Sequence, residues 1–403
     1  MLRIVCTLLT ILLFTNAALG CLWDRDTLSA EADGRTEVLN AIVGNYDQFP
    51  PEFYEARVQR LTWEITKNPD DFYLFDDLGV AWDRLGKSDD AISIMQAKKE
   101  RMDRLGDALE NKAEHEYRYL ANIGTFHVHR WFQKGKDWTN KEDLLKGRDY
   151  IQQAIELNPD AHFGREKYQL MIVDWLIDLP EDPTLDVLEN QRSLFSDDNK
   201  RNEANISESI TGLTGIITMG AGGESIELFH TLSRQLFIEG RSSVAYLAKL
   251  RKIELFEQDR PVLHPGFLEL TEEELNYTIT YRGGSLVEDL EQLDDWYALA
   301  RKRVVEANAR RMSYLKEMLK DNKHPDTHPE LWNRAPARAT LPALPGSLLN
   351  PSFSHFNWNY AVFIIPIIIL AVGLLQKFIE YRNVKKLLRA NQRELEAHGR
   401  IQE

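Results

Sequence analysis

Two pairs of histidines have residue types that could bind a metal ion. His127 and His129 are two positions apart, and side chains with that spacing on a helix point about 200° apart, so they cannot share one ion. His324 and His328 flank an aspartate between two prolines, without a cysteine or a third histidine nearby. We interpret the first pair as helix packing and the second as a loop. The sequence predicts no metal site and no cofactor.

Nucleophile and phosphate-binding motifs are equally weak. The run from Met219 to Ser225 is rich in glycine like a phosphate-binding loop, but it has no lysine and no strand clearly precedes it. The chain has no Gly-x-Ser-x-Gly motif and only two cysteines, Cys6 and Cys21. We predict that the protein is not an enzyme. The alternative is an envelope enzyme with a catalytic site in 177–333, where a pocket with converging polar groups would mark it.

The composition excludes further classes. The 403 residues include 49 Lys and Arg against 63 Asp and Glu, a net charge of −14, with 43% hydrophobic and 28% charged residues. This is too apolar for a disordered chain and too polar for a multi-span membrane protein. An acidic chain also lacks the basic surface that meets phosphates, so we expect no nucleic acid as a partner.

Two apolar segments predict export and anchoring. Residues 1–20 combine Arg3, an apolar run and small residues before Cys21, the pattern of a secretory signal peptide. The run Ala18 to Cys21 resembles a bacterial lipobox, except that Ala18 stands where Leu, Val or Ile is typical. If the match holds, Cys21 is acylated, and otherwise it is an ordinary thiol. Residues 358–376 form the second segment, which is long and apolar enough for one transmembrane helix.

The charges beside the second segment predict its orientation. The tail 377–403 has 7 basic and 4 acidic residues, whereas no Lys or Arg lies between 339 and 376. The positive-inside rule places such a tail in the cytoplasm. We therefore expect a single-pass protein of the cytoplasmic membrane whose N-terminal domain is extracytoplasmic, which is periplasmic in a bacterium. The exported part, 21–376, carries 41 basic and 59 acidic residues, a charge of −18.

The exported part predicts an all-α fold. Apolar residues recur three and four positions apart, and polar breaks at 68–71, 86–89 and 158–160 separate the periodic runs. The pattern predicts antiparallel helix hairpins packed in a row over 21–334. Residues 335–357 hold four prolines and no acidic residue, which predicts an extended linker before the membrane.

Residues 72–100 resemble one tetratricopeptide repeat (TPR), and 117–176 resemble an interrupted one with an insertion at about 133–141. Lys98 departs from the family pattern, which prefers alanine there. Weaker likeness covers 38–69 and 206–256. The glycines and alanines at the matching positions let two helices approach closely, and the proline ends a helix. The positions that carry the resemblance are Leu78, Gly79, Gly86, Ala91, Gly124, Gly147, Ala154 and Pro159.

The resemblance implies a TPR-like solenoid with a protein-binding face. We therefore expect a membrane-anchored scaffold that binds a protein or peptide on the extracytoplasmic side, and the acidic surface favours a basic partner. A purely structural assembly factor is a third option. The residues that we expect to point away from helix packing and to bind are Tyr73, Asp76, Asp77, Trp82, Asp83, His127 and Arg130.

Overall fold

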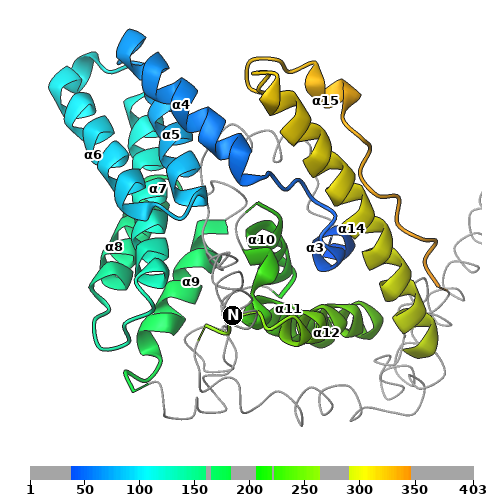
Figure 1. Ribbon diagram of the computed structural model, residues 1–403. Helices are drawn as coiled ribbons and strands as arrows, with labels where there is room; N and C mark the ends of the chain where they lie inside the picture. The colour runs from blue at the N-terminus through cyan, green and yellow to red at the C-terminus, as the bar shows by residue number, and fades with distance from the viewer. Residues whose placement is uncertain (1–37, 160–164, 183–205, 220–221, 264–289, 346–403) are drawn as a thin grey trace, which may run out of the picture. The chain divides into compact units, whose positions relative to one another are not determined.

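The computed structural model describes residues 38–159, 165–182, 206–219, 222–263 and 290–345, and every regular element in these ranges is helical (Figure 1). The prediction of an all-α fold is confirmed for them. The longer helices are α4 (Pro51–Lys67), α5 (Phe72–Arg84), α6 (Ser88–Leu105), α7 (Lys112–Gln133), α8 (Glu142–Leu157), α9 (Arg165–Asp178), α10 (Ile206–Met219), α11 (Ile226–Ile238), α12 (Ser242–Glu257) and α14 (Leu290–Lys320). The short ones are α3 (Val38–Val43), α15 (Leu331–Arg334) and two 3-10 turns, η1 (Gly106–Ala108) and η4 (Gly222–Glu224).

Several predicted segments lie outside the described residues: the signal sequence 1–20 with Cys21, the spanning segment 358–376 and the tail 377–403. Within the described ranges, no helix is both long enough and apolar enough to span a bilayer.

Local sequence signals explain where the helices begin and end. The Asp71 side chain caps α5 by accepting a hydrogen bond from the Tyr73 amide at 3.2 Å. Gly86 adopts a φ of +72° after the last turn of α5, a conformation that costs glycine little. Ser225 caps α11 through the Leu228 amide, which places the glycine-rich run at a turn between helices. The predicted breaks therefore coincide with helix ends.

Consecutive helices pack against each other from α4 through α12, and α5 also contacts α7. Helix α14 contacts α12, α3 and α4, so it touches both the first long helix of the array and the last (Figure 1). A large apolar core joins α3 and α7–α14, and two smaller ones lie among α4–α8. These packed layers hold the first helices of the hairpins, α5 and α7, in fixed positions.

Glycines Gly79, Gly124 and Gly147 mark close contacts among α5, α6, α7 and α8. A Cβ atom on Gly79 would lie 2.9 Å from Met95 and 3.1 Å from Phe126, on α6 and α7. A Cβ atom on Gly147 would lie 2.6 Å from Val128 and 2.8 Å from the carbonyl oxygen of Gly124. Only glycine permits these backbones to approach so closely. Ala91 and Ala154 are fully buried, Leu78 nearly so, and Pro159 follows the end of α8.

The described half of the predicted linker is packed on the helices. Residues 336–345, which we call the strap, run along α14 (Figure 1). Arg311 donates to the Pro336 carbonyl at 2.6 Å, and the Trp296 indole donates to the Pro342 carbonyl at 3.2 Å. The prolines prevent a helix, so the backbone carbonyls remain available as acceptors. The expectation of a spacer that begins at 335 is therefore corrected, because this part belongs to the helical domain.

Candidate functional site

The seven side chains that the sequence predicts for docking lie on α5 and α7, but most do not face solvent. Those of Asp76, Asp77, Asp83 and His127 are buried. Tyr73 is 39% exposed, and Trp82 and Arg130 are partly exposed. The expectation that all seven point away from helix packing is therefore wrong for the four buried ones. Their charge is matched by polar groups that periodicity did not reveal.

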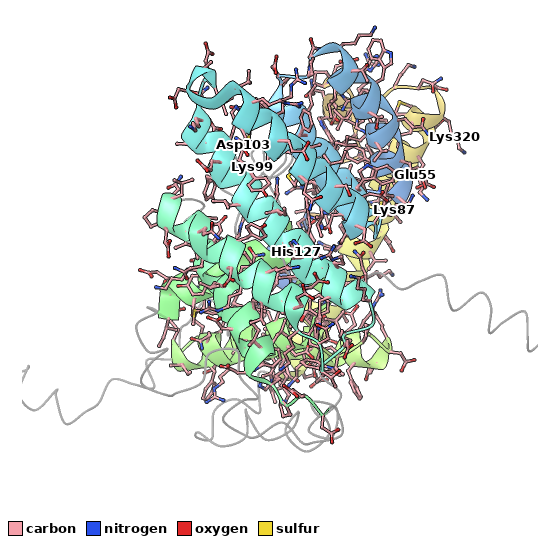
Figure 2. All side chains as sticks on the ribbon, turned by 90° about the vertical axis from the view of Figure 1, so that its left-hand side faces the viewer. Glu55, Lys87, Lys99, Asp103, His127 and Lys320 are labelled. Carbon is pink, nitrogen blue, oxygen red and sulfur yellow. The ribbon has the colours of Figure 1, made fainter. Side chains whose placement is uncertain are left out.

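Asp76 is buried because it pairs with Lys98. The Lys98 ammonium lies 2.6 Å from Asp76 Oδ1, and the Asn122 amide lies 3.3 Å from the same oxygen. Burial raises the pKa of Asp76 and lowers that of Lys98, and their contact opposes both effects. The neighbouring Lys99 instead faces solvent and pairs with Asp103 (Figure 2). The residue that departs from the repeat pattern is therefore an internal partner of a predicted site residue.

Asp83 joins α5 to α6 and α7. The Ser88 hydroxyl donates to Asp83 Oδ1 at 2.7 Å, and His129 Nδ1 lies 2.6 Å from Asp83 Oδ2. Serine, aspartate and histidine are thus adjacent, but the aspartate lies between the other two, so the histidine does not contact the hydroxyl. All three are buried. This arrangement orients side chains and does not activate a nucleophile.

His127 and Arg130 bind Asp143 on α8. The Arg130 guanidinium and His127 Nδ1, 3.1 Å away, both contact the Asp143 carboxylate. Burial raises the pKa of Asp143, but the bonds from Arg130 and His127 outweigh it and lower the pKa to about 2. The His127 ring also stacks on Tyr150, with 5.7 Å between centroids. Figure 2 shows His127 on α7. Both predicted residues therefore hold the α7–α8 hairpin.

Tyr73 is the exposed centre of a cluster formed with Glu114, His115 and Arg118 at the start of α7. The Arg118 guanidinium lies 4.8 Å from the Tyr73 ring centroid, and the His115 ring lies 4.9 Å away, edge-on. Arg118 also donates to Glu114 at 2.7 Å. We call these four residues the Tyr73 cluster. A tyrosine fixed in this way loses little side-chain entropy when a partner covers it.

The electrostatics of the Tyr73 cluster leave its histidine neutral. Burial lowers the pKa of His115 to about 4, and Lys98 contributes in the same direction. His115 Nδ1 is buried and has no hydrogen-bond partner among the described residues. Burial and the Glu114 carboxylate raise the pKa of Tyr73, so its hydroxyl stays protonated. The cluster therefore offers an aromatic face, a hydroxyl and a half-exposed carboxylate.

At the other end of α5, Trp82 is also covered by a cation. The Lys87 ammonium lies 4.6 Å from the Trp82 ring centroid. The partly buried Trp82 ring packs against both of the smaller apolar cores. This side chain is therefore mainly a packing residue.

In the described part of the stretch proposed for the enzyme alternative, the Glu227 carboxylate is buried and the Glu254 carboxylate is partly buried. Glu254 accepts hydrogen bonds from Arg301 at 2.6 and 2.8 Å and from Tyr297. Burial raises its pKa, but Arg301, Arg251 and Tyr297 together outweigh burial and lower the pKa to about 2. Glu227 accepts the Leu263 amide at 2.6 Å, and burial raises its pKa. Glu254 thereby joins α12 to α14, and Glu227 joins α11 to the segment that follows α12.

The chain matches no protein-family model, no curated protein and no solved structure. The likeness to TPR repeats therefore stays a prediction from the residues. In the described ranges, no three His, Cys, Asp or Glu side chains come together in a way that could hold a metal ion. The prediction that the chain is not an enzyme likewise remains a prediction.

Sequence reasoning selected Tyr73 but missed the other members of its cluster. Glu114 and Arg118 are four positions apart, a spacing that brings opposite charges together on a helix. The spacing of Glu114 and Arg118 was therefore a signal in the sequence. No signal in the sequence showed that they approach Tyr73, because that approach depends on how α5 and α7 pack.

Proposed function

We propose that the protein is a membrane-anchored scaffold that binds a protein or peptide on the extracytoplasmic side. In this proposal the helical domain is a TPR-like array of hairpins, 358–376 spans the cytoplasmic membrane once, and 377–403 is the cytoplasmic tail. Anchoring raises the local concentration of a bound partner near the membrane. The export and anchoring signals of the sequence support this arrangement.

The single observation that carries the docking proposal is the Tyr73 cluster. Of the eight large hydrophobic side chains that are most exposed among the described residues, two, Trp63 and Tyr73, are aromatic. Trp63 contacts one lysine, whereas Tyr73 is held by Arg118 and His115 together. Aromatic side chains in defined environments are typical centres of protein interfaces. The charge of −18 on the exported part favours a basic partner, and Glu114 offers it a carboxylate.

Site-specific crosslinking tests this proposal in the full-length protein in its own membrane. A photoreactive amino acid replaces Tyr73, and a matched one replaces Leu145 on α8, which is 48% exposed. We expect a discrete crosslinked partner from position 73 and none from 145. Equal products from both positions, or none from 73, would overturn the assignment of the docking surface.

A second variant separates docking from folding. Tyr73→Phe keeps the ring and its contact with Arg118, so we expect crosslinks from a probe at Glu114 to persist. Tyr73→Ala removes the ring, and we expect those crosslinks to fall at least about tenfold, as for an interface hot spot. Unchanged thermal unfolding of both variants is the control. Equal yields from the two variants would contradict a role for the ring.

Topology is tested by protease added to intact spheroplasts, or to sealed vesicles of known orientation. We expect the helical domain to be digested and a C-terminal fragment to be protected. Survival of the helical domain until lysis would overturn the extracytoplasmic location.

A further inference from the structure

The strap has the pattern of a polyproline II helix, an extended left-handed helix with three residues per turn. Five of its ten residues are prolines or directly precede one, which favours extended backbone conformations. Ala335, which leads into the strap, has φ −61° and ψ 142°, close to the polyproline II values. Exposed residues recur at every third position, at Ala337, Thr340 and Ala343, and Leu344 is exposed as well. These features together indicate a polyproline II backbone.

The rest of the domain binds the strap through its backbone carbonyls. Four side chains donate hydrogen bonds of 2.6 to 3.2 Å to these carbonyls: Arg311 to Pro336, Asn45 to Ala339, Arg303 to Thr340 and Trp296 to Pro342. Within the described ranges, no strap amide donates a hydrogen bond to a backbone carbonyl. A strand paired in a sheet would use both groups. Because every residue has a carbonyl, these bonds recognise the shape of the backbone more than the identity of the side chains.

The spacing of two donors on α14 matches the rise of a polyproline II helix. Arg303 and Arg311 are eight positions apart, which is about 12 Å along an α-helix. Their acceptors, the carbonyls of Thr340 and Pro336, are four positions apart, which is also about 12 Å at the polyproline II rise of 3.1 Å per residue. The strap runs antiparallel to α14. Another segment in the same conformation would therefore bring its carbonyls to the same donors.

Side chains of the strap add a second requirement. The partly buried side chains of Ala339 and Leu341 pack against the large apolar core. Arg338 forms an ion pair with Asp47, which also accepts a hydrogen bond from Arg311 at 2.7 Å. The site therefore fits a segment that has small or aliphatic residues and one basic residue beside its prolines.

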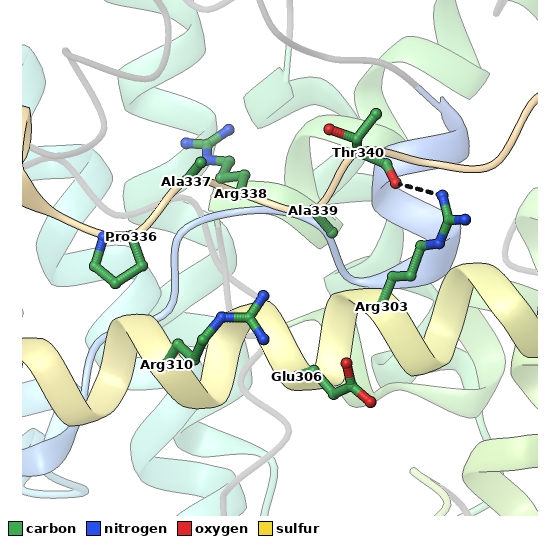
Figure 3. A pocket seen from close by; sticks show the side chains of 8 residues that line it. All are labelled: Arg303, Glu306, Arg310, Pro336, Ala337, Arg338, Ala339 and Thr340. Carbon is green, nitrogen blue, oxygen red and sulfur yellow. Dashed lines mark hydrogen bonds between the residues drawn. The ribbon is translucent and has the colours of Figure 1, made fainter.

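The strap is attached to α14 at separate points. A groove of about 400 Å³ lies between them, lined by Arg303, Glu306 and Arg310 on the helix and by residues 336–340 of the strap (Figure 3). Arg303 bonds to the strap, whereas Glu306 and Arg310 make no hydrogen bond to the residues drawn there. The side chains that pack the strap against the core are only partly buried. We therefore expect that the strap can leave while the helices stay packed.

We propose that α14, with Asn45 and Asp47, is a binding site for proline-rich segments in the polyproline II conformation, and that the strap is its internal, exchangeable ligand. The partner is a protein whose proline-rich segment replaces the strap and runs antiparallel to α14. The seated strap identifies this class of ligand, because the site binds features that such segments share. A polyproline II segment also has little conformational freedom to lose on binding.

This site uses other elements than the Tyr73 cluster and does not depend on the anchoring of the chain. The strap, as a tethered ligand, competes at an effective concentration on the order of 1 mM. A partner segment therefore binds tightly only when the strap has been released.

The test measures, by fluorescence anisotropy, how a labelled peptide with the sequence of residues 335–345 binds to the full-length protein in detergent micelles. One sample is the unsubstituted chain. The other carries Ala339→Asp and Leu341→Asp, which weaken the packing of the strap and leave the donors of α14 intact. We expect the variant to bind the peptide at least roughly tenfold more tightly, because its own strap no longer competes. A peptide with the same two substitutions should not bind.

A donor substitution supplies the matched comparison in the released chain. Trp296→Phe keeps an aromatic ring but removes the indole donor to the Pro342 carbonyl, so it should weaken peptide binding by roughly threefold or more. Trp82→Phe on α5 makes the same chemical change away from α14 and should not weaken binding. Helical content and thermal unfolding of every variant are the controls. If the double variant loses its helical structure, Arg338→Ala, which removes the ion pair with Asp47, takes its place.

Two outcomes would overturn the inference. One is a released chain that stays folded and does not bind the peptide, which makes the strap a fixed part of the fold. The other is equal binding by the released and the unsubstituted chains, or binding that Trp296→Phe leaves unchanged, which places the peptide elsewhere on the protein. Neither outcome bears on the crosslinks expected from Tyr73, so the two docking proposals can fail separately.

Discussion

The ammonium group of Lys98 lies 2.6 Å from Oδ1 of Asp76, and both side chains are buried between α5 and α6. In the resemblance to a TPR repeat, a small residue is expected at this position, and the helix pair here has an internal ion pair beside its apolar contacts. Buried ion pairs stabilise a fold weakly, but the loss of one partner is costly because it leaves a buried charge.

We predict that Lys98→Met lowers the free energy of unfolding by roughly 3–5 kcal/mol, because Asp76 loses its main partner. The double variant Asp76→Leu/Lys98→Met removes both charges and should recover at least about 1 kcal/mol of that loss. Urea unfolding followed by circular dichroism measures both. A double variant less stable than Lys98→Met would contradict the interpretation.

The ion pair between Asp326, in the loop after α14, and Arg57 on α4 leads to a second prediction about stability. Asp326 accepts two hydrogen bonds from the buried Arg57 guanidinium at 2.8 and 2.9 Å, which joins this loop to α4. We predict that Asp326→Ala costs about 3–5 kcal/mol and increases amide exchange in α15 and the strap more than in α7. Hydrogen exchange read by mass spectrometry checks this, and uniform deprotection would contradict a local joint.

His324 predicts a pH dependence of stability. Burial lowers its pKa from 6.5 to about 4, against the opposing charge of Asp326 and with smaller contributions from Arg57 and Arg60. Its Nδ1 accepts the Asp326 amide at 3.1 Å, and its Nε2 lies 3.1 Å from the Phe53 carbonyl, which fixes the neutral form.

Between pH 6.5 and 4 the unfolded chain therefore binds a proton at His324 that the folded chain does not. Stability is fully present above pH 6.5 and declines as the pH falls through this range, by up to about 3 kcal/mol from this group. His324→Gln should flatten the decline, and His115, whose pKa is also about 4, should supply a remaining slope. If the unsubstituted protein and His324→Gln lose stability along the same curve as the pH falls, the assignment of the decline to His324 is refuted.

The close contact between α7 and α8 at Gly147 allows a prediction for the addition of one methyl group. Because a Cβ atom on Gly147 meets both a side chain and a backbone oxygen of α7, Gly147→Ala must separate the two helices. We expect a loss of roughly 1–3 kcal/mol in thermal or urea unfolding. Lys146→Ala, one residue earlier and exposed, should change stability by less than about 0.5 kcal/mol. Similar losses in both would indicate a general effect on α8.

Helices and close contacts could be predicted because their signals are local. Gly79 and Gly86 lie within one hairpin: the polar break at 86–89 identified its turn, and the resemblance to a TPR repeat indicated its close helix contact at Gly79. The direction of charged side chains could not be predicted, because Asp76 has its partner 22 positions away and Asp83 contacts a histidine 46 positions away. The joint between Arg57 and Asp326 spans 269 positions, and no periodicity reports it.

The packing of the strap on α14 also could not be predicted, because it depends on contacts between distant parts of the chain. Its prolines correctly exclude a helix, but the carbonyls that hold it to α14 occur in every residue and leave no trace in the sequence.

The contacts of α14 with both α4 and α12 also bear on how this protein can change over evolutionary time. A row of hairpins with free ends can gain or lose a unit by duplication or deletion, since each unit touches only its neighbours. Among the described helices, α14 contacts both α4 and α12, so a hairpin added between those two would have to displace one of the contacts. We therefore expect divergence to proceed through loops and surface substitutions more readily than through changes in the number of hairpins.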